Sequence, residues 1–200
     1  MKILNALFFF VIGTSAMAQS QYEIEIKKWQ QELNESYADP EESPLEKKEL
    51  KKFKSLDFFP IEENYQVVAA FMRTPNEIPF NMPTSTERLP IYVKYGIAIF
   101  TLNGKEIELA VFQNDALTLK EEYKDYLFLP FTDETNGLAS YGGGRYLDIR
   151  IPEGDTLIID FNKAYNPYCA YSGRYSCPIP PRENVIALEI KAGVLAWKEH

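Results

Sequence analysis

Residues 95–114, YGIAIFTLNGKEIELAVFQN, constrain the fold more than any other stretch of this chain. Asn103-Gly104 stands near the middle, and this pair is typical of a two-residue type I′ turn, because both central positions need a positive φ angle. After the turn, apolar and more polar positions alternate, as in a strand with one buried face and one wetter face: Ile107, Leu109 and Val111 against Glu106, Glu108 and Ala110. The stretch therefore predicts an antiparallel β-hairpin.

Shorter alternating stretches predict further strands at residues 65–71, 126–131, 145–151, 156–162 and 184–191. The strands at 145–151 and 156–162 are expected to form a second hairpin that turns at Glu153-Gly154-Asp155. This order indicates a mainly β (α+β) fold, an antiparallel β-sandwich or partly open β-barrel preceded by two N-terminal helices.

The two helices are expected in residues 19–54, ahead of a β-rich domain at 55–200. Ser20 to Glu23 reads as a capping box, and an amphipathic stripe follows it at helical spacing: Tyr22, Ile26, Trp29, Leu33 and Tyr37. This stripe is expected to pack onto the body of the protein. Ser43 to Glu46 is a second capping box with Pro44 at the first helical position, and predicts a short helix to about Phe53.

The first 18 residues have the features of a secretory signal peptide. Lys2 provides the positive end, residues 3–12 are mostly apolar, and Ala16-Met17-Ala18 fits the small-residue cleavage rule. We therefore expect cleavage after Ala18 and a periplasmic or secreted protein. Gln19 rather than Cys follows the cut, which argues against a bacterial lipid anchor, and no later segment is long and apolar enough for a membrane span.

The charge and the scarcity of histidine exclude several function classes. The chain has 21 basic and 29 acidic residues, and loss of Lys2 with the signal peptide leaves 20 basic residues and a net charge of −9, which argues against nucleic acid and anionic membranes as partners. His200 is the only histidine, so Ser-His-Asp and Cys-His catalysis and the common histidine-containing zinc sites are not expected. No metal or other cofactor is expected. Acid–base chemistry would fall to Asp, Glu, Tyr, Lys or Cys.

Four motifs in the second half of the chain resemble an uncharacterised bacterial family, the domain-of-unknown-function family 1684. They are FLPFTDETNG, SYGGGRYLD, DFNKAYNPYCAYSGRYSCPIPPREN and IKAG, and the resemblance covers about residues 55–195. Ser140 stands where the pattern leads us to expect Thr, so a hydroxyl is kept. The resemblance implies no activity, but it marks residues 131–137, 141–148 and 160–184 as the family's signature.

Two cysteines lie in the longest motif. Cys169 and Cys177 are eight residues apart in a chain expected to be exported, a setting where disulfides form and persist. We expect a structural disulfide, which would stabilise the fold by about 2.5 kcal/mol in the chain-entropy model. A redox-active pair and a paired metal site are the alternatives.

The second predicted hairpin suggests a polar face. In either register, one face carries Tyr146, Asp148, Arg150, Ile158, Asp160 and Asn162. One register sets Asp148 opposite Asp160, and the other sets Tyr146 opposite Asp160. Two carboxylates in that position would be candidates for paired acid–base catalysis, as in glycoside hydrolysis. Alternatively, Asp160 caps the following loop through backbone N–H groups.

Tyrosine is concentrated in the same region, because six of the 13 tyrosines fall in residues 141–175. A tyrosine ring packs while its hydroxyl meets a polar partner, which suits a pocket for a small polar or anionic ligand. The candidate ligand-binding residues are Tyr141, Arg145, Tyr146, Asp160, Asn162, Tyr165 and Asn166. Residues 160–184 would be a rigid lid over the polar face, with Arg145 in contact with Asp148, Asp160 or a lid tyrosine. A polar loop packed over a sheet end is the alternative.

Gly142-Gly143-Gly144 precedes this region and suits either a backbone nest for an anion or a tight turn into a strand. Three functions remain open from the sequence. The first is an exported ligand-binding module. The second is a hydrolase or lyase that uses Asp148 and Asp160. The third is a structural envelope protein with no ligand.

Overall fold

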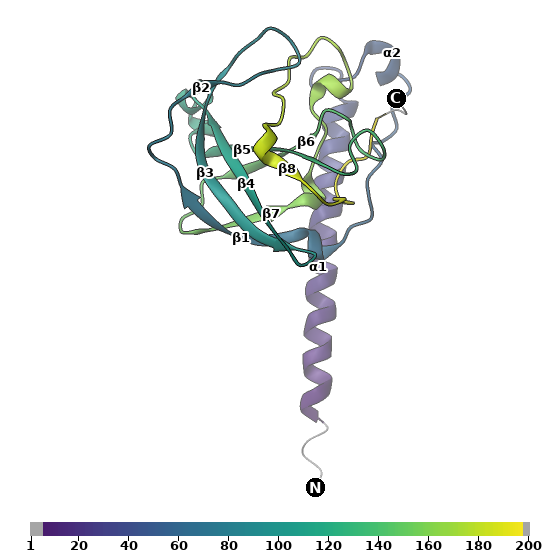
Figure 1. Ribbon diagram of the computed structural model, residues 1–200. Coiled ribbons are helices and arrows are strands. Elements are labelled where there is room, and N and C mark those ends of the chain that lie inside the picture. The colour runs from purple at the N-terminus through teal and green to yellow at the C-terminus, as the bar shows by residue number, and fades with distance from the viewer. Residues whose placement is uncertain (1–5, 198–200) are drawn as a thin grey trace.

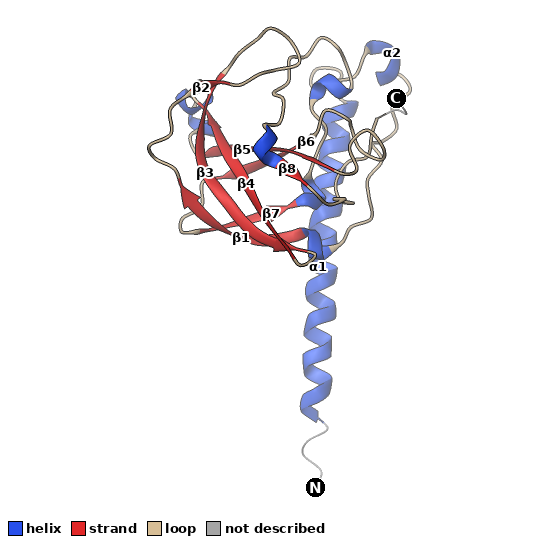
Figure 2. Ribbon diagram, in the orientation of Figure 1, coloured by secondary structure: helices blue, strands red, loops and turns tan. Residues whose placement is uncertain are grey.

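The computed structural model describes the backbone of residues 6–197 and the side chains of residues 21–197. One curled, largely antiparallel sheet dominates it, so the predicted mainly β, partly open barrel is confirmed (Figures 1 and 2). The strand order is β6-β5-β4-β3-β1-β7, with β2 paired to β3 and β8 running parallel to β5. The strands are β1 Gln66–Arg73, β2 Phe80–Asn81, β3 Ile91–Leu102, β4 Lys105–Asn114, β5 Tyr126–Asp133, β6 Arg145–Arg150, β7 Thr156–Asp160 and β8 Val185–Ile186.

The predicted hairpin at 95–114 is confirmed as β3 and β4. Asn103 and Gly104 have φ angles of 51° and 75°, as the type I′ turn requires. Leu102 pairs with Lys105 and Phe100 with Ile107, so alternate residues of both strands point to the inside of the curl. There they join the largest hydrophobic cluster, to which β1, β5, β6 and β7 also contribute.

The second predicted hairpin is wrong, although both of its strands form. β6 pairs with β5, which places Asp148 opposite Phe128, and β7 pairs with β1, which places Asp160 opposite Gln66. The two strands therefore stand at opposite ends of the sheet order. Alternation predicts a strand and its buried face, but it does not select the neighbouring strand, and the curl of the sheet lets residues 151–155 connect its two ends.

The predicted late strand at 184–191 is much shorter than expected, because only Val185–Ile186 forms β8.

The fully buried Asn184 makes up for sparse pairing between β4 and β5. Its Oδ1 accepts from the Ala110 amide at 2.8 Å, and its Nδ2 donates to the carbonyls of Ala110 and Pro130 at 2.8 and 2.7 Å. A side chain thus substitutes for backbone ladder bonds that β4 and β5 do not make with each other there.

Helix α1, Ala6–Ala38, runs without a break through Ser20, so the helix does not start at the predicted capping box. Its N-terminal part projects from the body, and its C-terminal part lies along the side of the half-barrel (Figure 1). There Tyr37 packs against Tyr171 with ring centroids 5.0 Å apart. Helix α2 spans only Lys47–Leu50, shorter than predicted. Among the described residues, we find no helix that combines the length and apolar character a membrane span requires.

The first residue of β6 lies in the core. Arg145 has no exposed surface, and its Nη2 contacts Asp133 Oδ2 at 2.8 Å and the Ile190 carbonyl at 2.8 Å. Its Nη1 donates to the Ala192 carbonyl. Asp133 Oδ1 also accepts from the Thr135 and Ile190 amides. This buried ion pair therefore joins β5, β6, the turn after β5 and the C-terminal segment.

Replacing Arg145 by Met should lower the free energy of unfolding by about 3–5 kcal/mol, because Asp133 would remain charged and unpaired in the core. Arg150→Met is the matched control, because Arg150 ends the same strand but makes an exposed ion pair with Asp125, worth at most about 1 kcal/mol. Urea unfolding of both variants measures the difference. Equal, small losses would contradict a structural role for the buried pair.

Candidate functional site

A pocket of about 460 Å³ lies between α1, the outer face of β6 and two parts of the 160–184 segment. Because side chains alternate along β6, Tyr146 and Asp148 face this pocket while Arg145, Leu147 and Ile149 face the core. Six aromatic rings, two prolines, a leucine, a serine and three ionisable side chains line it: Trp29, Leu33, Tyr37, Tyr146, Asp148, Lys163, Tyr165, Pro167, Tyr168, Tyr175, Ser176, Cys177 and Pro178.

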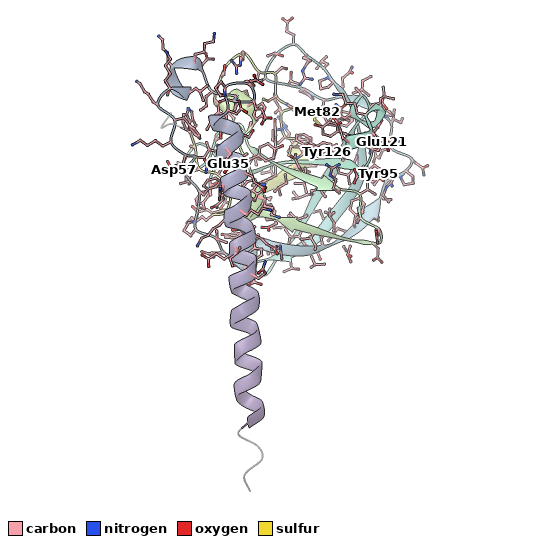
Figure 3. The ribbon with its side chains drawn as sticks, turned by 180° about the vertical axis from the view of Figure 1, so that it is seen from behind. Glu35, Asp57, Met82, Tyr95, Glu121 and Tyr126 are labelled. Atoms are coloured by element: carbon pink, nitrogen blue, oxygen red, sulfur yellow. The ribbon has the colours of Figure 1, made fainter. Side chains whose placement is uncertain are left out.

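The carboxylate of Asp148 is held by two tyrosines from different parts of the chain. The hydroxyls of Tyr126 and Tyr165 both donate to Asp148 Oδ1, at 2.8 and 2.6 Å. Figure 3 labels Tyr126 on the side of the molecule along which α1 runs. Asp148 is nevertheless exposed, and its Oδ2 accepts no hydrogen bond from the residues that the structure describes. The arrangement fixes one oxygen and leaves the other without a hydrogen-bond partner among the described residues.

Burial raises the pKa of both tyrosines well above the ordinary value of 10, and the adjacent Asp148 charge raises it further. Both hydroxyls therefore stay protonated and keep donating at any physiological pH.

The lid segment is attached to the free edge of β6. Tyr146 and Tyr165 exchange two backbone hydrogen bonds of 2.9 and 3.0 Å, and their rings meet at 87° with centroids 5.9 Å apart. The Tyr146 hydroxyl donates to the Pro178 carbonyl, which holds the other end of the segment. Tyr165 of this segment therefore lies beside β6, the strand that carries Asp148, whereas Tyr171 packs against Tyr37 of α1.

Asp160 and Asn162 lie outside the pocket lining, in a separate hydrogen-bonded group at the end of β7. Asp160 Oδ1 accepts from the Asn162 amide and the Tyr22 hydroxyl, both at 3.0 Å, and Oδ2 accepts from Gln66 at 3.2 Å. The Asn162 side chain bonds both backbone groups of Glu62. Asp160 thus caps the following 3₁₀ turn, as the alternative expectation had it.

The structure also places the remaining predicted residues. The predicted contact of Arg145 with the lid is wrong, because Arg145 is enclosed with Asp133. Asn166 is buried and donates to the Leu195 carbonyl at 2.8 Å. The Tyr141 hydroxyl lies 3.8 Å from Cys169 Sγ. Gly144 has a φ of 89°, and a Cβ there would lie 2.7 Å from the Phe131 carbonyl, which supports a tight turn into β6.

Several pocket residues were not predicted as site residues. Trp29, Leu33 and Tyr37 were expected only to pack α1 onto the body, and Lys163, Tyr168 and Tyr175 were not among the candidate ligand-binding residues. The helical stripe signals burial in general, and nothing in its spacing shows that part of it faces a cavity.

Cys169 and Cys177 are free thiols that lie side by side, so the predicted disulfide is not formed in this structure. The Cys169 amide donates to Cys177 Sγ at 3.1 Å. Hydrogen bonding from the Cys177 thiol, helped by the Tyr141 hydroxyl, lowers the pKa of Cys169 to about 6. The same interaction and burial raise the pKa of Cys177. Cys169 is therefore the more nucleophilic thiol of a close pair.

Comparison with known proteins gives a family but no activity. A family model described as "Protein of unknown function (DUF1684)" matches residues 51–195. Among solved structures, the chain is similar to an uncharacterized protein of Haloarcula marismortui determined by solution NMR, with 31% identity, a TM-score of 0.71, and coverage of 92% of this chain and 99% of that one. That coverage extends beyond the family range into the N-terminal segment. No curated protein matches the chain.

In reduced protein, alkylation of Cys169 by iodoacetamide should rise with pH through a midpoint near 6, because the thiolate is the reacting form. Cys177 should stay unreactive in the folded state up to about pH 9, above the usual thiol pKa. Peptide mapping after timed alkylation measures both. Equal reactivity of the two thiols, with a common midpoint above pH 8, would contradict the assignment.

Proposed function

This chain belongs to the DUF1684 family, and we propose that it binds a small organic ligand in the pocket between α1 and β6. The observation that carries the proposal is that Asp148, whose Oδ2 has no hydrogen-bond partner among the described residues, lines an aromatic pocket of about 460 Å³. A ligand would place a hydrogen-bond donor or a positive group at Oδ2 and its apolar body against the rings. Pockets for small molecules commonly combine apolar walls with a few fixed polar groups in this way.

The walls of the pocket are held before any ligand arrives. The backbone bridge between Tyr146 and Tyr165 and the bond from Tyr146 to Pro178 fix the lid segment on β6. Tyr126 and Tyr165 fix the orientation of Asp148. A preformed site has less conformational entropy to lose on binding, so each contact contributes more to affinity.

Hydrolysis by paired carboxylates is less well supported. That mechanism needs two carboxyl groups on one cleft, and Asp160 does not line the pocket that contains Asp148. Hydrogen bonds from Tyr22, Gln66 and Asn162 already occupy both Asp160 oxygens. A purely structural protein with no ligand remains the alternative that the binding experiment tests.

We also propose that the protein is exported and cleaved after Ala18, and that Cys169 and Cys177 then form a disulfide. Cleavage there would remove much of the projecting part of α1 and keep Tyr22, whose hydroxyl contacts Asp160 and Asn162. The closeness of the two thiols supports the disulfide, because little backbone movement would be needed to join them.

A thermal-shift screen of mature protein against metabolites and glycans should find ligands that raise the melting temperature, since ligand at 100 times Kd stabilises by about 2.7 kcal/mol. Asp148→Asn should weaken binding about tenfold or more, because a hydrogen bond to a charged group contributes about 1.5–3 kcal/mol. The variant should stay folded, because Asn keeps an oxygen that accepts from the Tyr126 and Tyr165 hydroxyls, and circular dichroism checks this. The matched control is Asp155→Asn, an exposed position outside the pocket. Equal binding by both variants, or no hit for wild type, would contradict the proposal.

Intact mass spectrometry tests export and the disulfide together. Protein recovered from the periplasm or medium of an expressing bacterium should start at Gln19 and weigh two hydrogens less than the reduced chain. Reduction should restore those hydrogens and expose both thiols to alkylation. An intact Met1 would contradict cleavage, and two free thiols in unreduced protein would contradict the disulfide.

A further inference from the structure

The pocket walls suit a cation. Its tyrosine rings meet at steep angles, 87° between Tyr146 and Tyr165 and 63° between Tyr168 and Tyr175. The pocket is lined by Trp29 and five tyrosines, and a ring face that meets an ammonium group attracts it by cation–π interaction. The Tyr175 ring already has the Arg174 guanidinium 4.8 Å from its centroid, so the other rings are the ones left for a ligand cation.

Asp148 adds a negative charge to these walls. Its Oδ1 accepts hydrogen bonds from two tyrosine hydroxyls, and its Oδ2 has no partner among the described residues. A positive group against the rings would gain both the cation–π attraction and the Coulomb attraction of this carboxylate. The acidic character of the whole chain, with a net charge of −8, also favours the approach of a cation over that of an anion.

Lys163 supplies the opposite charge in the same pocket. It ends the 3₁₀ turn that Asp160 caps, and it is partly buried. Within residues 21–197 it forms no ion pair, with Asp148 or with any other acid. The pocket therefore contains one carboxylate and one ammonium that do not neutralise each other.

We propose that the ligand is a small zwitterion. Its alkylated or primary ammonium group lies against the tyrosine rings beside Asp148, and its carboxylate or phosphate pairs with Lys163. This inference rests on the proposed function, since it names the ligand class of the same pocket. One ligand of this kind satisfies both unpaired charges, whereas a simple cation leaves Lys163 unpaired and a simple anion is repelled by Asp148.

Isothermal titration calorimetry of mature protein with three matched probes tests the inference. The probes are phosphocholine, choline, which lacks the phosphate, and 3,3-dimethylbutyl phosphate, in which carbon replaces the charged nitrogen. Phosphocholine should bind about tenfold more tightly than choline or 3,3-dimethylbutyl phosphate, since a desolvated cation–π contact or a partly buried ion pair is worth about 1–2 kcal/mol.

The variants assign each charge to its partner. Lys163→Gln should weaken phosphocholine about tenfold and should not weaken choline, because it removes a positive charge from the same pocket, and Asp148→Asn should weaken both. The matched controls are Lys47→Gln and Asp155→Asn, at exposed positions outside the pocket. Circular dichroism of each variant checks that it is folded.

Three results would overturn the inference: equal binding of phosphocholine and 3,3-dimethylbutyl phosphate, no effect of Lys163→Gln on phosphocholine, or no binding of phosphocholine at millimolar concentration. If an uncharged ligand from the thermal-shift screen bound in an Asp148-dependent way while phosphocholine did not, the proposed function would stand and the zwitterion would fall. If neither bound, both would fall.

Discussion

The ion pair between Arg145 and Asp133 is the interaction on which the rest of the structure depends. Both side chains lie entirely inside the protein, where a charge without a partner would cost several kcal/mol. Arg145 also donates to the carbonyls of Ile190 and Ala192, and Asp133 accepts from Thr135. The pair therefore fixes β6 against β5 and holds the C-terminal segment at their end.

The position of the pocket follows from this arrangement, because β6 contributes side chains both to the core and to the pocket. The odd-numbered residues of β6, Arg145, Leu147 and Ile149, point into the core, so the even-numbered Tyr146 and Asp148 face outward. The lid segment then pairs with the free edge of β6 through Tyr165, and α1 closes the opposite side. Much of the family signature thus builds the scaffold, and a few of its residues reach the pocket.

Local signals predicted the local features of the fold. The β3–β4 hairpin was predictable because its turn pair and the alternation of its apolar and polar residues both lie within 20 residues of sequence. The partners of β6 and β7 were not, because strand pairing at the ends of a curled sheet depends on contacts distant in sequence. Arg145 shows a second limit: its spacing from Leu147 and Ile149 places it on the core side, but its charge suggested a ligand site.

The candidate site was partly predictable for the same reason. Tyr146, Asp148 and Tyr165 stood out by their residue types within one region, and they lie together in the pocket. Trp29 and Lys163 did not, because helix packing brings the first to the site and the capped turn after β7 brings the second.

Trp29 offers the most direct test of the claim that this pocket binds a ligand, because it lines the pocket and the chain has only two tryptophans. In a Trp197→Phe variant, Trp29 becomes the sole fluorophore of this type and reports on the site. A ligand that stabilises the protein should change its emission saturably, with the same Kd that calorimetry gives, and Asp148→Asn should shift that change to about tenfold higher ligand concentration. Stabilisation with no change in Trp29 emission, and no dependence on Asp148, would place binding elsewhere and contradict the assignment of the pocket.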